Sequence, residues 1–151
     1  MWCRGRVPRW PIDCRLPGWS RDIQCAQGNR LAQCDANHQS KASFLSVLAP
    51  QFEVFQWHGD MFSVPPGARL LASSAACPHQ AFQYGDHVLA MQFHLDYSRD
   101  SIQRMVHHCA NELKAGPHIQ DDPKVLIDLQ RAQALEKQLF SLLDRCSRAT
   151  T

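Results

Sequence analysis

Two side chains in the second half of the chain have types and spacing suited to acid–base chemistry. His94 and Asp96 lie two residues apart, directly after the apolar run 88–93. If the backbone stays extended there, the two side chains point the same way, so the carboxylate can accept a hydrogen bond from one imidazole nitrogen. That contact would fix the ring tautomer and support a positive charge on it, as in the base half of a nucleophilic triad. A pair of this kind also fits an ordinary polar strand end.

The seven cysteines suggest neither a metal site nor a disulfide framework. The four that come first are widely spaced along the chain: Cys3, Cys14, Cys25 and Cys34. Structural zinc sites usually bring two ligands within roughly two to four residues of each other, so this spacing is a poor match. His107, His108 and Cys109 are adjacent, and on a helix adjacent side chains point in different directions. We therefore predict no metal, no cofactor and reduced thiols, with a zinc or redox module as a distant alternative.

The strands and turns that would position His94 can be predicted from periodicity. The expected strands cover residues 51–57, 68–73, 80–84 and 87–93, and Gly85 and Asp86 form the turn between the last two. The run 88–93 is apolar at nearly every position, which predicts a strand buried on both faces. His94 would then lie at the end of a buried strand, where ligands bind α/β sheets.

Two helices are expected after this sheet. Ser98 is a suitable N-cap, and Gly116 with Pro117 would end the first helix. Pro123 can open the second helix, whose apolar residues recur at helical spacing and predict one face packed on the domain. That stripe comprises Val125, Leu129, Ala132, Leu135, Leu139, Leu142, Leu143 and Cys146.

The N-terminal residues differ in composition from the rest of the chain. Residues 1–38 contain three Trp, four Cys and six Arg but no Phe, Tyr, Glu or Lys, and Pro8, Pro11 and Pro17 interrupt any periodicity. We therefore predict an irregular segment over 1–43 and a partial domain over 44–151.

Composition and charge restrict the class of partner. Apolar residues make up 44% of the chain and charged residues 20%, which suits a globular domain. The formal net charge of +2 gives no reason to expect nucleic acid or a membrane surface as a partner. Neither an export signal nor an apolar run of membrane-spanning length is visible, so we expect a cytoplasmic location.

Several strings in order closely resemble the class I glutamine amidotransferases, best the stand-alone, GMP-synthase-like members. The strings are FQWHGDMF, VPPGA, LLASS, CPHQAF, YG and QFH, and the resemblance extends over about residues 52–113. It implies the α/β, flavodoxin-like three-layer fold of that family, of which this chain would hold the C-terminal half. It also implies glutamine, or a γ-glutamyl small molecule, as substrate and a synthetase as a possible ammonia-accepting partner.

The resemblance assigns roles to five residues. By position His94 matches the catalytic base and Asp96 the acid that orients it, although the family usually has the longer glutamate there. His58, Gly59 and Asp60 match the segment that lies against bound glutamine in relatives. In that family a cysteine attacks the glutamine amide, ammonia leaves, and water hydrolyses the thioester.

The nucleophile of the family is missing from this sequence. The resemblance calls for a G-x-C-x-G elbow roughly 80 residues before the histidine, and neither Cys3 nor Cys14 has the flanking glycines. A codon choice for residues 8–38, read one nucleotide later, yields the family-like strings QLIA, GGRV and KEIGW. We therefore expect residues 1–38 to be an out-of-frame translation. Two interpretations stay open: an incomplete glutaminase domain, and a non-catalytic remnant or pseudoenzyme.

Overall fold

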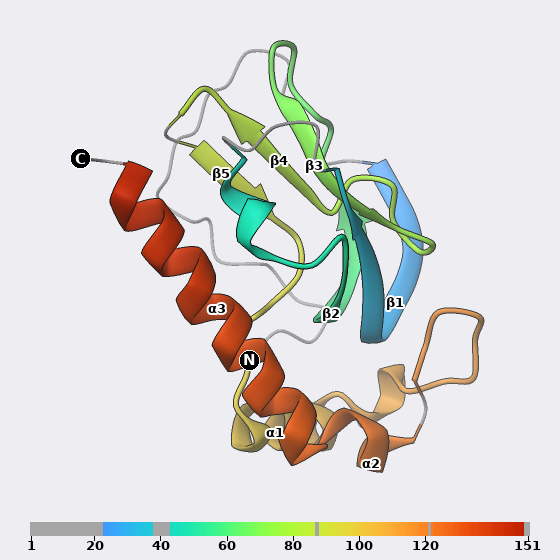
Figure 1. Ribbon diagram of the computed structural model, residues 1–151. Coiled ribbons are helices and arrows are strands. Elements are labelled where there is room, and N and C mark those ends of the chain that lie inside the picture. The colour runs from blue at the N-terminus through green and yellow to red at the C-terminus, as the bar shows by residue number, and fades with distance from the viewer. Residues whose placement is uncertain (1–22, 38–42, 87, 121, 150–151) are drawn as a thin grey trace.

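The computed structural model describes residues 23–37, 43–86, 88–120 and 122–149, with the backbone alone for residues 23–31 and 149. Its strands are β1 (Ile23–Ala36), β2 (Gln51–Met61), β3 (Arg69–Ser74), β4 (Ala81–Tyr84) and β5 (Val88–Met91). Its α-helices are α1 (Arg99–His108), α2 (Pro123–Leu126) and α3 (Leu129–Ala149), and two short 3₁₀ turns are η1 (Phe44–Val47) and η2 (Ala110–Glu112). Figure 1 shows α3 running along one flank of the sheet, with α1 and α2 gathered near its N-terminal end.

The described strands form one five-stranded sheet in the order β2-β1-β3-β4-β5, and every neighbouring pair is antiparallel. An isolated bridge between Phe55 and His94 then joins the segment after β5 back to β2, the strand at the opposite edge. Its two hydrogen bonds are His94 N to Phe55 O at 2.8 Å and Phe55 N to His94 O at 3.3 Å. The sheet is thus nearly closed on itself, and His94 lies where the two ends meet.

Local sequence explains the turns and helix ends around this sheet. Gly85 adopts φ of +56° between β4 and β5, a left-handed conformation that glycine reaches without steric cost. Ser98 caps α1 as predicted, accepting a hydrogen bond from Ser101 N while the Ser101 side chain accepts one from Ser98 N. The Asp122 side chain caps α2, and Pro123 occupies its first turn as expected.

The core lies between the sheet and the helices. α3 packs against η1 and β2. The most completely buried side chains of the core are mainly aliphatic and aromatic: Leu45, Val54, Phe55, Leu71, Phe82, Ile102, Leu126 and Leu135. In the described part of the chain, no helix combines the length and apolar character that crossing a bilayer requires.

Two expectations about the strands are wrong. Residues 23–36, inside the segment predicted as irregular, form β1, which pairs with β2 and β3. In β1 the buried residues Ala32 and Cys34 alternate with the exposed residues Gln33 and Asp35. Because the buried side chains are small, this alternation gives only a weak hydropathy pattern in the sequence. The run 88–93 is not buried on both faces: β5 ends at Met91, which is exposed, because this strand pairs only with β4 and forms a sheet edge.

The helical expectations also need correction. α1 ends at His108 and not at Gly116, and the second helix is interrupted after Leu126 before α3 begins. Within the predicted apolar stripe, Ala132, Leu135 and Leu142 are buried, whereas Leu129 and Leu143 are exposed. Helical periodicity identifies a face, but it cannot tell how much of that face finds a neighbouring surface.

Candidate functional site

His94 and Asp96 lie together as their spacing predicts. His94 Nδ1 is 3.2 Å from Asp96 Oδ1. An ionised carboxylate can only accept a hydrogen bond, so this contact requires a hydrogen on Nδ1. In the neutral ring, Nε2 then carries the lone pair and is the atom able to take a proton. Both side chains are open to solvent, with exposed fractions of 47% for His94 and 69% for Asp96.

The ring of Tyr97 packs against the ring of His94. The two rings meet edge to face with centroids 4.7 Å apart and an angle of 85° between their planes. Tyr97 packs in turn on Phe55 at 4.3 Å, and its hydroxyl donates to Met105 Sδ at 3.6 Å. His94 is therefore fixed at its backbone by Phe55, at Nδ1 by Asp96, and along its ring by Tyr97.

The half-buried phenol of Tyr97 stays protonated over a wide pH range. Burial, with a smaller contribution from the Asp96 carboxylate, raises the pKa of Tyr97 to about 12. A neutral Tyr97 ring beside His94 leaves Asp96 as the group that supports a positive charge on the imidazole.

His58 lies close enough to His94 for their charges to interact. Burial lowers the pKa of His58 below its usual value, and the neighbouring His94 acts in the same direction. Hydrogen bonds to Asp60 and Gln80 act the other way without reversing the shift; the Asp60 contact joins His58 Nδ1 to the backbone oxygen at 3.0 Å. The structure thus brings a mostly neutral second imidazole to the edge of the His94 site.

Two buried glutamines, which the sequence interpretation missed, lie behind His58. Gln56 and Gln80 are fully buried. Gln80 Nε2 donates to Gln56 Oε1 at 2.6 Å and to Ser74 Oγ at 2.9 Å. The sequence did offer a signal for both residues. Gln80 is a polar residue inside the CPHQAF string and Gln56 is one inside β2, and both occupy positions that must face the interior.

His58, Gly59 and Asp60 were expected just beyond a strand end. They instead lie within β2, which continues to Met61. His58 and Gly59 are half-buried and Asp60 is exposed. The strand extends because β1 pairs with it over almost its whole length, with His58 opposite Gly28 and Asp60 opposite Gln24. Their proposed contact with substrate stays a prediction.

The described cysteines offer no accessible nucleophile of the expected kind. Cys34 and Cys77 are not disulfide-bonded and are fully buried, and the Cys77 thiol contacts His79 O at 3.5 Å and Gln92 Nε2 at 3.3 Å. Cys146 is not disulfide-bonded either, and burial raises the pKa of its thiol, which disfavours the reactive thiolate. Cys3 and Cys14 lie outside the described residues.

Cys109 corrects the expectation of reduced thiols throughout, because it is disulfide-bonded. Spacing along the chain does not reveal which residues the fold brings together. Within the described ranges, no group of three His, Cys, Asp or Glu side chains is arranged to hold a metal ion.

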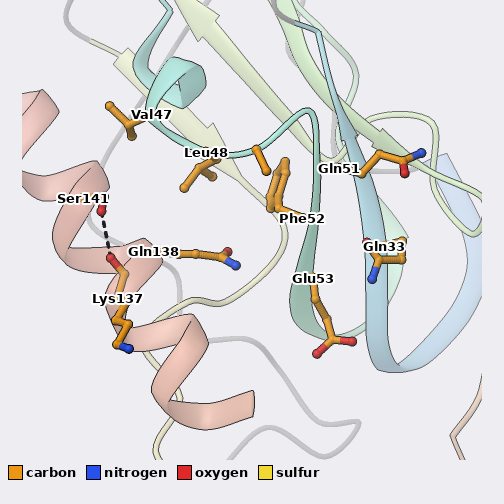
Figure 2. A pocket seen from close by; sticks show the side chains of 10 residues that line it. Gln33, Val47, Leu48, Gln51, Phe52, Glu53, Lys137, Gln138 and Ser141 are labelled. Carbon is orange, nitrogen blue, oxygen red and sulfur yellow. Dashed lines mark hydrogen bonds between the residues drawn. The ribbon is translucent and has the colours of Figure 1, made fainter. Parts of the chain in front are cut away.

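Two cavities lie against α3. One of about 350 Å³ lies between α3 and the β1–β2 edge, where Figure 2 shows Gln138 reaching from the helix toward β2. A second cavity has a volume of about 500 Å³, and its lining among the described residues comes from α3, including Lys137 and Phe140. Neither is lined by His94, Asp96 or His58.

Solved structures of known proteins share this fold. A glutamine amidotransferase of Methylobacillus flagellatus superposes with a TM-score of 0.78 at 24% identity, over 87% of this chain and 56% of that protein. A glutamine amidotransferase of Thermotoga maritima superposes with a TM-score of 0.70 at 26% identity, over 85% and 55%. The α/β fold class, as part of the amidotransferase fold, is confirmed.

The sequence also matches a curated relative. The glutamine amidotransferase-like protein YfeJ of Salmonella typhimurium is 32% identical over 83 residues, which cover 55% of this chain. The match spans only a third of the length of that relative, and this chain spans a little over half of the two solved structures. No family model matches the chain.

Proposed function

Because this chain is a relative of the class I glutamine amidotransferases and holds part of their fold, we propose that it is an incomplete glutaminase domain. In this proposal His94 and Asp96 are the base and the orienting acid of the triad. The observation that carries it is the 3.2 Å contact between His94 Nδ1 and Asp96 Oδ1, which leaves Nε2 free to accept a proton.

The chemistry assigned to these residues is proton transfer during hydrolysis of the glutamine side-chain amide. His94 Nε2 takes the proton of a cysteine thiol, and the thiolate attacks the amide carbon. His94 then protonates the departing ammonia, and with water it reverses these roles to release glutamate from the thioester. Asp96 stabilises the imidazolium that forms at each stage. His58, Gly59 and Asp60 would lie along the bound glutamine.

The nucleophile and the two backbone N–H donors for the oxyanion would come from a G-x-C-x-G elbow that this sequence lacks. We therefore expect the domain, whose sheet includes β1 as well as the predicted 44–151, to need a segment that supplies this elbow for activity. A synthetase that accepts the ammonia, and a cytoplasmic location, belong to the same proposal. The out-of-frame origin of residues 1–38 is tested by the nucleotide sequence, which must encode QLIA, GGRV and KEIGW in the shifted frame.

Fragment complementation tests the assignment of His94. The chain is mixed with an amidotransferase fragment that carries the elbow, and ammonia released from glutamine is measured. The elbow fragment paired with its own C-terminal part serves as the positive control, and co-elution on a sizing column shows whether this chain associates.

We expect background ammonia from the chain alone and release above background from the mixture. Release should fall to background with His94→Ala, fall in part with Asp96→Asn, and rise with Asp96→Glu, which restores the longer family acid. Release that survives His94→Ala would remove His94 from the mechanism.

A second candidate function is that of a non-catalytic remnant or pseudoenzyme. The observation that favours it is the exposure of both His94 and Asp96, since bases that act in catalysis usually lie in a site that excludes water. An associated but inactive mixture, beside an active positive control, would support this candidate.

A further inference from the structure

The outer face of α3 carries large apolar side chains that the fold leaves uncovered. Leu129, Phe140 and Leu143 have exposed fractions of 54%, 58% and 52%. Helical spacing places Leu129, Phe140 and Leu143 on one face, with the exposed Glu136 between Leu129 and Phe140. Figure 1 shows α3 running along one flank of the sheet. Scattered exposed apolar residues are ordinary, but Phe140 and Leu143 adjoin on one face of the helix, and such a pair indicates a contact surface.

Charges on the same helix match a second copy of itself. Lys137 and Asp144 are both exposed, lie seven residues apart, and flank Phe140. If two α3 helices pack antiparallel, a two-fold axis between Phe140 and Ser141 places Lys137 opposite Asp144 of the other copy. Symmetry produces this pair twice, because in a two-fold interface each contact between two positions occurs in both directions. The same axis places the two Phe140 rings next to each other.

We propose that the chain forms a two-fold dimer through the outer face of α3, with Phe140 and Leu143 at its centre and two Lys137–Asp144 pairs at its side. A hollow beside this face, lined among the described residues by Gln133, Glu136, Lys137 and Phe140, would receive the partner ring. A pair of single helices buries a modest area, so the dimer is in exchange with monomer. This inference does not depend on the proposed glutaminase function.

Sedimentation equilibrium of the full chain, with a charge swap, tests the proposal. Lys137→Asp places two acidic side chains opposite each other at both pairs and should raise the dissociation constant about tenfold, as should Asp144→Lys. The double variant Lys137→Asp/Asp144→Lys restores both pairs in reversed order and should return the constant to near its original value. Phe140→Ser should give monomer alone.

Lys114→Asp is the matched control, because it makes the same charge change at an exposed position outside α3 and should leave the dimer unchanged. A wild-type chain that stays monomeric at the highest soluble concentration would overturn the proposal. So would a dimer that is unaffected by Phe140→Ser, or a double variant as weak as the single ones. Circular dichroism shows that each variant keeps its helical content.

Discussion

The ring contact by which Tyr97 positions His94 can be tested by two substitutions at position 97. Tyr97→Leu removes the aromatic ring, and Tyr97→Phe keeps the ring and removes only the hydroxyl. Aromatic pairs contribute about 0.5–1.5 kcal/mol each beyond their buried area, and the Tyr97 ring makes two such contacts, with Phe55 and with His94. We therefore expect Tyr97→Leu to lower the free energy of unfolding by about 1–3 kcal/mol.

The hydroxyl is expected to matter less than the ring. Its partner is a sulfur, Met105 Sδ at 3.6 Å, which is a weak acceptor. Tyr97→Phe should therefore cost less than about 1 kcal/mol. Urea unfolding of the two variants and the parent chain gives both values.

A second readout separates positioning of His94 from general stability. The Tyr97 ring shifts the proton resonances of the His94 imidazole, and these shifts should be kept in Tyr97→Phe and lost in Tyr97→Leu. Equal destabilisation by the two variants would show that the hydroxyl, and not the ring, makes the important contact. Unchanged His94 resonances in Tyr97→Leu would refute the positioning role itself.

Three further predictions concern the buried polar groups near this site. The pKa of Tyr97 rises from 10.0 to about 12 on folding. Its contribution to the free energy of unfolding is therefore complete below pH 10 and is lost as the pH rises toward 12. Over that range the urea midpoint of Tyr97→Phe should decline less than that of the parent chain. The pKa of His58 falls below 6.5 on folding, so its contribution to the free energy of unfolding is present above pH 6.5 and is lost as the pH falls through the pKa of the folded state. His58→Gln should therefore flatten the acid side of the plot of stability against pH. An unchanged plot would contradict this. Gln80→Leu leaves Gln56 Oε1 without its donor and should cost about 1–3 kcal/mol, and Gln56→Leu/Gln80→Leu should recover part of that loss in the same unfolding assay.

Short-range patterns predicted the elements that surround the site. The strand over 51–57, the turn at Gly85, the Ser98 cap and the proline that opens α2 each depend on a few neighbouring residues, and the structure contains all four. The contact between His94 and Asp96 was predictable for the same reason, since two residues of extended chain suffice to bring the side chains together.

Features that depend on distant partners were not predictable in this way. β1 forms because β2 and β3 pair with it on both sides, while its own small side chains give a weak pattern. The bridge from Phe55 to His94 spans the two edges of the sheet, and the exposure of Leu143 depends on the absence of a covering surface among the described residues. Tyr97 and Gln80 become visible as site residues only once these contacts are formed.

The tautomer of His94 tests most directly whether its neighbouring acid prepares it to act as a base. Long-range proton–nitrogen spectra of the ¹⁵N-labelled chain distinguish a ring protonated at Nδ1 from one protonated at Nε2. With Asp96 in place, the neutral ring should carry its hydrogen on Nδ1, and Asp96→Asn should remove that preference. A ring that carries its hydrogen mainly on Nε2, or a preference that Asp96→Asn leaves unchanged, would contradict the assignment of His94 and Asp96 as base and orienting acid.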